Sequence, residues 1–520
     1  MRATSIGHAG LLVETDHGSI LCDPWFVPAF FGSWFVFPRN DQLSPDLLAR
    51  IETADHLYIS HLHADHLDEP WLRTHLRRDI PVLVPGFPTD ELARTLSAIG
   101  FTNLVRTVDG DVVHLGRGGR LGVAIHCETS VSDGPQGDSA LVVYDGETRL
   151  LNQNDCRPHD LRILAERGPI DVQWLQYSGA IWYPMVYDEP EERKRALAVA
   201  KVEAQFARAV RYVRDVGARA VVPAAGPPAF LDPDLFAMNV IDGSEISIFP
   251  DQAAFLRRLT AEHIDTARLL VPGSTIEVTS TDVTVTHPLP DESVEAIFKG
   301  KRAYLERYQA DWAGWLAEHK ATWRAARPGL VERMAEWFEP LLDLAPHLRT
   351  GIGAPILLVA TGADAIEILV DVPGAAVRQW QGEAYGFRFE IDRRLIETVV
   401  DRRAVDWSNA LFLSCRFRAW RPGPFNEYVY NLFKSLSPER IARAESEAAA
   451  RIAGPDAEHE EIELGGYLLE RYCPHRNADL TRFGEVDGST LTCTLHGWQF
   501  DLDTGTCLTA ADRKLRVRRP

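Results

Sequence analysis

The hydrophobic and polar positions of residues 1–290 alternate between short apolar runs and a longer helical pattern. The short runs end in Gly, Pro or Asp, which is typical of buried β-strands. Over residues 191–217 the apolar positions instead recur at helical spacing, and Gly217 supplies a stop signal. The strand-like segments are "GLLVET", "SILCD", "HLYISH", "PVLVPG", "LGVAIHCE", "SALVVYDG", "RLLNQND" and "ARAVVPAAG". Strands interleaved with helices predict a layered α/β domain.

The pattern changes after this domain. Residues 291–354 are helical, and their Trp, Tyr and Phe recur at helical spacing, so we expect a connector whose aromatic stripe packs into a core. Residues 355–440 return to a mixed α+β pattern, in which "PILLVATG" and "AIEILVDV" are predicted to pair. Residues 441–520 begin with an acidic, Ala-rich helix and linker and end in a β-rich module. The sequence thus predicts an α/β multidomain protein.

The length, net charge and cysteine content of the chain restrict the classes of protein to which it can belong. At 520 residues the chain is too long for one hydrophobic core, and its net charge of -19 argues against nucleic acid or an anionic membrane as partner. No apolar run is long enough for a membrane span, and the N-terminus lacks a signal pattern. Seven cysteines are few and odd in number, which favours a reducing cytoplasmic setting over a disulfide scaffold.

Two cysteines and two histidines near the C-terminal end have the spacing of a metal site. Cys473 and His475 lie in "CPHRNADL", and Cys493 and His496 lie in "CTLHGWQFDL". This spacing puts two thiolates and two imidazoles on two tight turns. Structural zinc sites also use such a set. In a Rieske [2Fe-2S] cluster, two cysteines hold one iron and two histidines hold the other.

Both segments resemble the ligand loops of the Rieske family, including the Gly-Trp-x-Phe and Asp-x-x-x-Gly that follow the second loop. The resemblance implies a small all-β domain within residues 441–520. It also implies a [2Fe-2S] cluster bound by Cys473, His475, Cys493 and His496. In this family the histidine-ligated iron lies near the surface, where it can pass one electron to a neighbouring site.

A second group of ligand candidates lies in "SHLHADHLD", which supplies His61, His63, Asp65 and His66 after a predicted strand. On a strand-to-helix turn, the two alternating histidines can face one metal while Asp65 and His66 face a second. The motif resembles the metallo-β-lactamase fold, as does the opening "IGHAGLLVETDHGSILCDPW". The resemblance implies an αββα sandwich over residues 1–290 with a metal site.

The other ligands that this fold implies are less regular here. Where hydrolases of the fold place a third histidine, "HCETS" offers His126 or Glu128. The strand "RLLNQND" ends in Asp155, where the fold places a metal-bridging carboxylate. The usual late histidine is missing from "AVVPAAGPPAF". His159 is near in sequence, although a helix-cap or surface role fits it as well.

A site that includes Glu128 and Asp155 beside the histidines is rich in oxygen ligands. Zinc hydrolases prefer histidine and keep a water as nucleophile, whereas carboxylate-rich sites with open positions suit iron that binds dioxygen. Iron-using members of the fold replace histidine by carboxylate, so the resemblance favours two iron ions, with zinc as the alternative. We take Glu128 and Asp155 as the candidate catalytic carboxylates. His8 and Asp23 are expected to support the ligands or to fill core and turn roles.

The two ends of the chain together favour an oxygenase. A redox-inert zinc hydrolase has no use for a one-electron carrier, whereas dioxygen activation at iron needs electrons one at a time. The pairing of a Rieske centre with a metallo-β-lactamase-like domain resembles the CMP-N-acetylneuraminate hydroxylase family, although that family carries its Rieske domain at the N-terminus. The resemblance implies O₂-dependent hydroxylation of a small or medium organic substrate. No dinucleotide-binding motif is visible, so we expect a ferredoxin, cytochrome or flavoprotein reductase as external electron donor.

Two other functions fit the same residues. A metal-dependent zinc hydrolase with a redox-sensing Rieske cluster would contain zinc and consume no O₂. A Rieske electron-transfer protein with a decayed metal site would contain the cluster but little second metal, and the missing late histidine favours it. Residues 355–440 also resemble a sterol-carrier-type fold, which implies a lipidic ligand; an ordinary spacer domain is the alternative.

Overall fold

The computed structural model describes residues 1–129, 137–158, 168–453, 460–475, 478–510 and 513–519. The candidate His159 lies outside these described residues. The chain divides into two compact units. One unit consists of Met1–Ile181 and Ala198–Ala317, and the other of Trp182–Leu197 and Glu318–Pro520.

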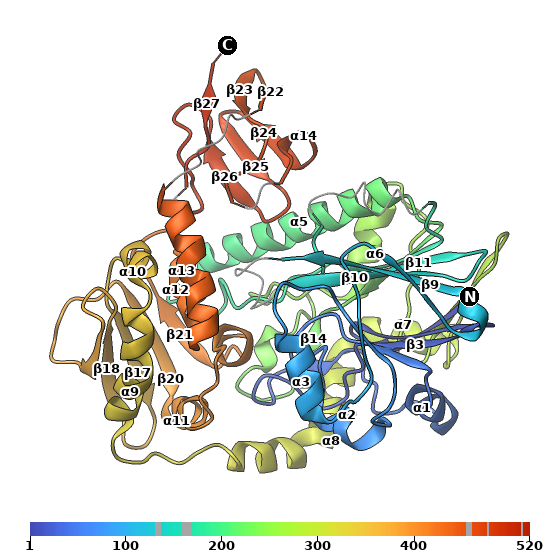
Figure 1. Ribbon diagram of the computed structural model, residues 1–520, viewed down its shortest axis with the longest axis horizontal. Helices are drawn as coiled ribbons and strands as arrows, with labels where there is room; N and C mark the ends of the chain where they lie inside the picture. Colours follow the sequence, from blue (N-terminus) through green and yellow to red (C-terminus); the bar gives the residue numbers. More distant parts are fainter. Residues whose placement is uncertain (130–136, 159–167, 454–459, 476–477, 511–512, 520) are drawn as a thin grey trace. The chain divides into compact units, whose positions relative to one another are not determined.

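Two β-sheets form the centre of the first unit (Figure 1). The larger sheet has the order β16-β15-β1-β2-β3-β5-β6-β7, and the smaller has the order β13-β12-β11-β10-β9-β8. The strands of the larger sheet are β1 (Arg2–Gly7), β2 (Gly10–Thr15), β3 (Gly18–Cys22), β5 (His56–Tyr58), β6 (Val82–Val84), β7 (Leu104–Arg106), β15 (Thr275–Val278) and β16 (Val283–Thr286). Those of the smaller sheet are β8 (Val112–Leu115), β9 (Leu121–Glu128), β10 (Asp138–Tyr144), β11 (Arg149–Asn154), β12 (Val172–Gln176) and β13 (Ala220–Ala224). Apolar side chains of both sheets, such as Leu11, Ile20, Val123 and Trp174, share one buried core.

Helices cover the outer faces of this sandwich. The apolar sides of α1 (Pro45–Glu52), α2 (Glu69–His75) and α3 (Glu91–Ile99) share a core with Leu12, Leu21 and Leu57 of the larger sheet. On the smaller sheet, Phe206 of α5 (Glu191–Val216) and Phe255 of α6 (Gln252–Ala261) pack on Tyr177, which follows β12. The layers confirm the predicted αββα arrangement.

The long helix predicted over residues 191–217 is confirmed as α5. Gly217 ends it with a φ of 61° and donates its N–H to the Val213 carbonyl at 2.9 Å, a left-handed C-terminal cap that suits glycine. The aromatic stripe of α8 (Lys301–Ala321) packs as predicted, because Tyr308 and Trp312 contact Phe35 edge-on, at ring-centroid distances of 6.1 and 5.4 Å. Phe35 lies in the short strand β4 (Phe35–Val36), which pairs with β14 (Pro228–Ala229).

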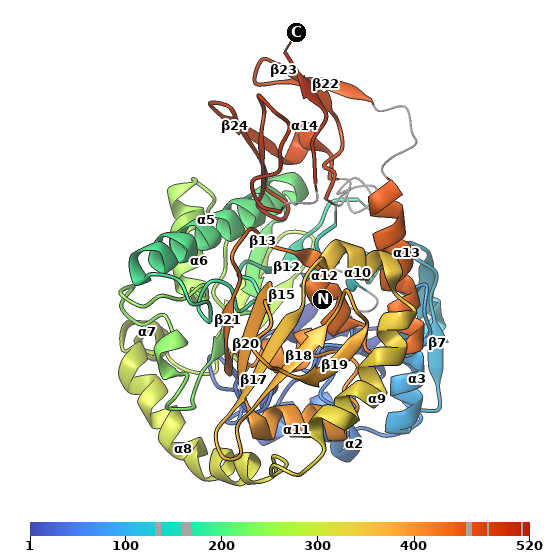
Figure 2. The same ribbon diagram turned by 90° about the vertical axis from the view of Figure 1, so that its left-hand side faces the viewer.

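A five-stranded sheet of order β19-β18-β17-β20-β21 forms the centre of the second unit (Figure 2). Its strands are β17 (Ile356–Thr361), β18 (Ile366–Asp371), β19 (Ala376–Gln379), β20 (Phe387–Asp392) and β21 (Phe417–Trp420). The antiparallel pairing of β17 with β18 is the predicted one. The helices of this unit include α9 (Leu330–Asp343), α10 (Pro346–Ile352), α11 (Arg393–Asp401), α12 (Glu427–Lys434) and α13 (Pro438–Ala453). The predicted connector is therefore divided, since α7 (Asp291–Lys299) and most of α8 belong to the first unit.

The C-terminal part of the second unit is the expected β-rich module. One three-stranded sheet contains β22 (Glu461–Leu464), β23 (Tyr467–Glu470) and β27 (Val517–Arg518). The other contains β24 (Gly484–Asp487), β25 (Thr490–Cys493) and β26 (Trp498–Asp501), with α14 (Leu480–Phe483) before it. Leu469, Leu491, Phe500 and Leu515 are buried inside the module. Within the described ranges, no helix combines the length and the hydropathy that crossing a membrane requires.

Candidate metal centres

The loop with the His-x-His-x-Asp-His motif follows β5, beside the end of β3. These two strands are parallel and pair Cys22 with Tyr58, so the residues that follow them meet at one edge of the sheet. Asp23 ties the two loop starts together, because its carboxylate accepts the Ser60 N–H at 2.8 Å and the Ser60 hydroxyl at 2.6 Å. Asp23 and Ser60 are both fully buried. Side chains of the protein itself therefore hold the start of the motif in place.

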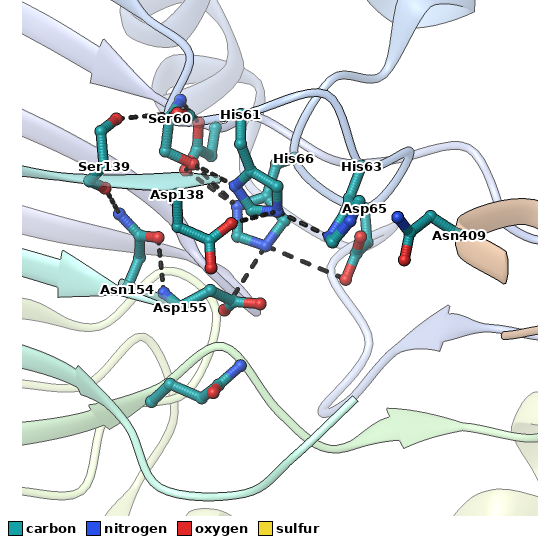
Figure 3. A network of polar contacts seen from close by, with 12 residues as sticks. Ser60, His61, His63, Asp65, His66, Asp138, Ser139, Asn154, Asp155 and Asn409 are labelled. Carbon is teal, nitrogen blue, oxygen red and sulfur yellow. Dashed lines mark hydrogen bonds and ion pairs between the residues drawn. The ribbon is translucent and has the colours of Figure 1, made fainter. Parts of the chain in front are cut away.

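The structure brings the predicted N-terminal ligands together, with Asp155 beside them (Figure 3). His61 Nε2 lies 2.8 Å from His63 Nδ1, and the ring centroids of His61 and His66 lie 4.1 Å apart. His66 Nε2 lies 3.5 Å from Asp155 Oδ1 and 3.9 Å from Asp65 Oδ2. His61, His66 and Asp155 offer ligand atoms that all lie within 4.8 Å of one another. A single ion could bind all three.

The electrostatics of this cluster suit a cation. Asp65 Oδ1 and Asp155 Oδ1 are buried and accept no hydrogen bond from the described residues. Burial lowers the pKa of His61 well below its usual value, and the neighbouring imidazoles act in the same direction, which favours the neutral form that binds metal. Burial also acts to lower the pKa of His66, but the charges of Asp155 and Asp65 outweigh it and raise that pKa. The carboxylates therefore favour a positive charge here, and a metal ion fits the site.

Asp23 contacts the predicted ligand His66, and His8 contacts the predicted ligand Asp65. These contacts agree with the supporting role expected for both residues. Asp23 Oδ2 lies 2.9 Å from His66 Nδ1, which leaves His66 Nε2 facing Asp155. His8 Nε2 lies 3.0 Å from Asp65 Oδ2. Burial acts to raise the pKa of Asp65, but the charge of His66 and the hydrogen bond with His8 lower it well below the usual value. Such partners fix the orientation of metal ligands.

The loop after β13, where the fold usually supplies a late histidine ligand, contacts His8 in this structure. After β13 the chain passes Ala225, which has a φ of 48° and donates its N–H to the His8 carbonyl at 3.0 Å. The loop that usually supplies the late ligand therefore lies beside His8. Ligand atoms of His8, Asp65 and His66 also fall within 4.8 Å of one another. His8 is thus a ligand candidate in its own right, which its position in the sequence did not indicate.

A further carboxylate, Asp138, was not singled out from the sequence. Asp138 Oδ1 lies 3.6 Å from His61 Nε2, and Asp138 opens β10 directly opposite Glu128 in β9. Directly opposite residues place their side chains on the same face of a sheet, so Glu128 stays a predicted ligand beside Asp138. His126 shares that face by the two-residue period of β9. The signal in the sequence was a charged residue at the start of the buried strand "DSALVVY".

Three of the acidic side chains act on one buried thiol, that of Cys156. Burial raises the pKa of Cys156, and the charges of Glu128, Asp138 and Asp155 raise it further. These three residues come from β9, β10 and the end of β11, so neighbouring strands bring acidic groups to the same end of the smaller sheet. An oxygen-rich ligand set of this kind suits a hard or redox-active cation more than a thiolate-binding one.

The C-terminal ligands lie on two loops of the β-rich module. Cys473 follows β23 and donates its N–H to the Ala478 carbonyl at 2.9 Å. Cys493 ends β25, and Gly497, with a φ of 74°, donates its N–H to the Cys493 carbonyl at 2.8 Å. Both cysteines are buried and outside any disulfide, whereas His475 and His496 are half-buried.

The two histidine rings are arranged to face a common ligand. Their centroids lie 4.8 Å apart at 87°, and His475 stacks on Trp498 at 4.0 Å. His475 Nδ1 is buried and has no hydrogen-bond partner in the described part of the chain. A Rieske [2Fe-2S] cluster fits this set of two buried thiols and two neighbouring imidazoles.

A buried carboxylate from another element contacts this site. Glu427, near the start of α12, has Oε1 3.7 Å from His475 Nε2, and its Oε2 accepts hydrogen bonds from Arg451 at 2.8 Å and Arg513 at 3.3 Å. Burial acts to raise the pKa of Glu427, but His475 and the two guanidinium groups lower it well below the usual value. Glu427 is therefore a fixed negative charge beside a cluster ligand. The spacing of the cluster motif carried no sign of it.

Fold and sites together define a Rieske protein with a β-lactamase-superfamily domain. Residues 19–224 match the β-lactamase superfamily domain, residues 330–450 the Rv3818-like, SCP2-like domain, and residues 463–517 the Rieske [2Fe-2S] domain. The chain is 47% identical to the Rieske 2Fe-2S iron-sulfur protein Rv3818 of Mycobacterium tuberculosis over 100% of both sequences. It belongs to the family of that protein. The predicted pairing of the two domains, with the Rieske domain C-terminal, is confirmed.

More distant similarities cover the chain in part. Cytidine monophosphate-N-acetylneuraminic acid hydroxylase of Mus musculus is 28% identical over 237 residues, which span 44% of this chain and 39% of the hydroxylase. Among solved structures, CmlA, a diiron beta-hydroxylase from Streptomyces venezuelae, covers 53% of this chain and 54% of its own, with 20% identity and a TM-score of 0.35.

Proposed function

We propose that this protein is an iron-dependent oxygenase that hydroxylates an organic substrate with O₂. The observation that carries the proposal is the presence of a Rieske domain and a buried, carboxylate-rich metal site in one chain. Two iron ions at the N-terminal site would activate dioxygen with single electrons supplied by the [2Fe-2S] cluster. The hydroxylase named among the relatives supports the same class of reaction.

The ligand set supports iron over zinc. His61, His63 and His66 are joined by Asp65 and Asp155, and the acidic side chains opposite each other in β9 and β10 raise the share of oxygen donors. Catalytic zinc sites commonly combine three protein ligands with one water. A mixed histidine–carboxylate set with open positions is the arrangement that suits oxygen-activating iron.

The residues of the chain hold this site rigid and charged. Asp23 contacts Nδ1 of His66 and orients its ring, and Nε2 of His8 contacts Oδ2 of Asp65. The burial of the cluster excludes bulk water, which strengthens the electrostatic interactions of the carboxylates. In the Rieske module, the charge of Glu427 orients His475 through Nε2 and leaves Nδ1 available to the cluster.

The proposal requires partners that this chain does not supply. An external donor of the ferredoxin, cytochrome or flavoprotein-reductase type would reduce the cluster. The co-substrates are O₂ and a small or medium organic molecule.

The test is a single-turnover experiment. The protein is reduced under anaerobic conditions, freed of excess reductant and mixed with O₂, and the Rieske absorbance is followed as it reoxidises. We expect fast reoxidation in the wild-type protein and reoxidation at least tenfold slower in His61→Ala. Equal rates in the two proteins would contradict an electron path to the N-terminal site. Zinc in that site together with equal rates would favour the hydrolase.

A further inference from the structure

One face of α5 carries a row of polar residues, of which Gln205 and Arg208 are buried and Lys201 is half-buried. Lys201, Gln205 and Arg208 are four and three residues apart, so they share one side of the helix. Gln205 is 1% exposed and Arg208 is 6% exposed. A helix that covers a sheet normally turns an apolar stripe towards it, because buried polar groups cost free energy unless they are paired. The Gln205 amide in particular is a neutral polar group whose burial costs free energy unless it is paired.

A fourth basic residue comes from the smaller sheet. Arg157 follows Asp155 closely and donates from Nη2 to Gln176 Oε1, at the end of β12, at 3.2 Å. The hydroxyl of Tyr212 on α5 donates to the Pro158 carbonyl at 3.1 Å, so this face of the helix lies against the segment that carries Asp155 and Arg157. The basic row and the metal site thus share one segment of chain.

The polar groups of this face are incompletely paired. Both amide atoms of Gln205 are buried and have no hydrogen-bond partner among the residues that the structure describes, and the same holds for Arg157 Nε. The amide lies against Gly179, where an added Cβ would come within 2.4 Å of Gln205 Nε2. A side chain at position 179 would therefore displace the amide from its present place. A side chain that is 1% exposed and is accommodated in this way indicates a built site.

The charge balance points to an anion. Burial lowers the pKa of Lys201 to about 8, and the charges of Arg208 and Arg157 act in the same direction. Burial and Arg157 also lower the pKa of Arg208, while Asp155 opposes the shift. Lys201 and Arg208 share one face of α5, and the hydrogen bond of Tyr212 with Pro158 brings the segment of Arg157 against that helix, in a chain whose net charge is -19. An anionic ligand would be repelled by the chain as a whole, so it needs such a local concentration of positive charge.

We propose that Lys201, Gln205, Arg208 and Arg157 bind the carboxylate or phosphate group of an anionic ligand beside Asp155. Arginine and lysine supply charged donors for such an oxyanion, and the Gln205 amide supplies a neutral one. That the ligand is the substrate rests on the proposed oxygenase function. The binding of the anion does not, because the site consists only of side chains of the first unit.

The test is anion binding by the full-length, metal-loaded protein without reductant or O₂. Inorganic phosphate and acetate are titrated separately at constant ionic strength, with chloride as the reference anion, and binding is followed by calorimetry and by the shift in Tm. We expect saturable binding of at least one of the two anions. The stronger of the two tells whether the ligand carries a phosphate or a carboxylate.

Variants make the assignment specific. We expect Lys201→Gln and Arg208→Gln each to weaken binding at least tenfold without loss of N-terminal metal. Arg214→Gln is the matched control, because Arg214 lies on the same helix but is exposed and pairs with Glu262 at 2.7 Å. Gln205→Leu replaces the amide by an apolar side chain of similar bulk and leaves the charge unchanged, so weaker binding in this variant would not depend on a change of charge. Equal affinities in the wild-type protein and in both lysine and arginine variants would overturn the proposal.

Failure of this site and failure of the proposed function give different results. Anion binding without O₂-dependent reoxidation of the cluster would retain the site and remove the oxygenase. Fast reoxidation without binding of either anion would retain the oxygenase and remove the site.

Discussion

The two metal centres of this protein are built in opposite ways. In the Rieske module, the four predicted ligands come from two loops of one small β-domain, and the two cysteines among them are buried in it. In the first unit, the predicted ligands come from loops that follow several strands, and all of them are nitrogen or oxygen donors. A local, closed site suits a group that only gains and loses electrons. A site assembled from many strands can leave positions open for O₂ and substrate.

The two metal centres are distinguished most clearly by a variant that loses one centre and keeps the other. Cys493→Ser removes a thiolate ligand, and we expect complete loss of the Rieske absorbance and electron paramagnetic resonance signal, with N-terminal metal retained. Cys507→Ser is the matched control, because Cys507 is a buried cysteine of the same module outside the ligand loops. Loss of both metal centres in Cys493→Ser would contradict their independence.

The reverse separation uses the N-terminal motif. We expect His61→Ala to lose about half of the total iron and to keep the Rieske spectrum, because His61 lies at the centre of the N-terminal cluster. His75→Ala provides the control, since His75 is exposed and pairs with Glu52. If the Rieske spectrum also disappeared from His61→Ala, the two centres would not be separate sites.

Glu128 and Asp138 are the two candidates for a third carboxylate ligand of the N-terminal site, beside Asp65 and Asp155. Asp138 contacts His61, whereas Glu128, directly opposite Asp138, is the ligand predicted from the sequence. We expect Glu128→Gln and Asp138→Asn each to weaken metal binding by about 10–100-fold, as measured by competition with a chelator. Wild-type affinity in Glu128→Gln together with a loss in Asp138→Asn would transfer the ligand role to Asp138.

The smallest effect concerns the potential of the Rieske cluster. Reduction adds negative charge to the cluster, so the ionised Glu427 beside His475 disfavours it. We expect Glu427→Gln to raise the reduction potential by on the order of tens of millivolts, measured by redox titration. Glu447→Gln is the control, because Glu447 pairs with the same Arg451, and no described contact links it to His475. Equal shifts in both variants would assign the effect to the arginine.

How far the sequence predicts these sites follows from how they are built. The predicted Rieske ligands and the motif of His61 to His66 each lie close together in sequence, so both patterns could be recognised by their resemblance to known families. Asp138 joins the cluster through strand pairing, and His8 joins it through a hydrogen bond with Asp65 from a different loop; spacing cannot reveal such contacts. Glu427 reaches His475 from α12, an element outside the Rieske motif. The hydrophobic periods predicted a layered α/β domain, and the resemblance to the metallo-β-lactamase fold implied that its layers form an αββα sandwich.

The central claim is that the N-terminal site binds iron for use with electrons from the Rieske cluster. The most direct measurement is the metal content of the anaerobically purified full-length protein, by elemental analysis combined with quantification of the cluster by its spectrum. We predict about four irons per chain, two of them in the cluster. Two irons accompanied by zinc would contradict the claim and support the hydrolase, and two irons alone would leave an electron carrier.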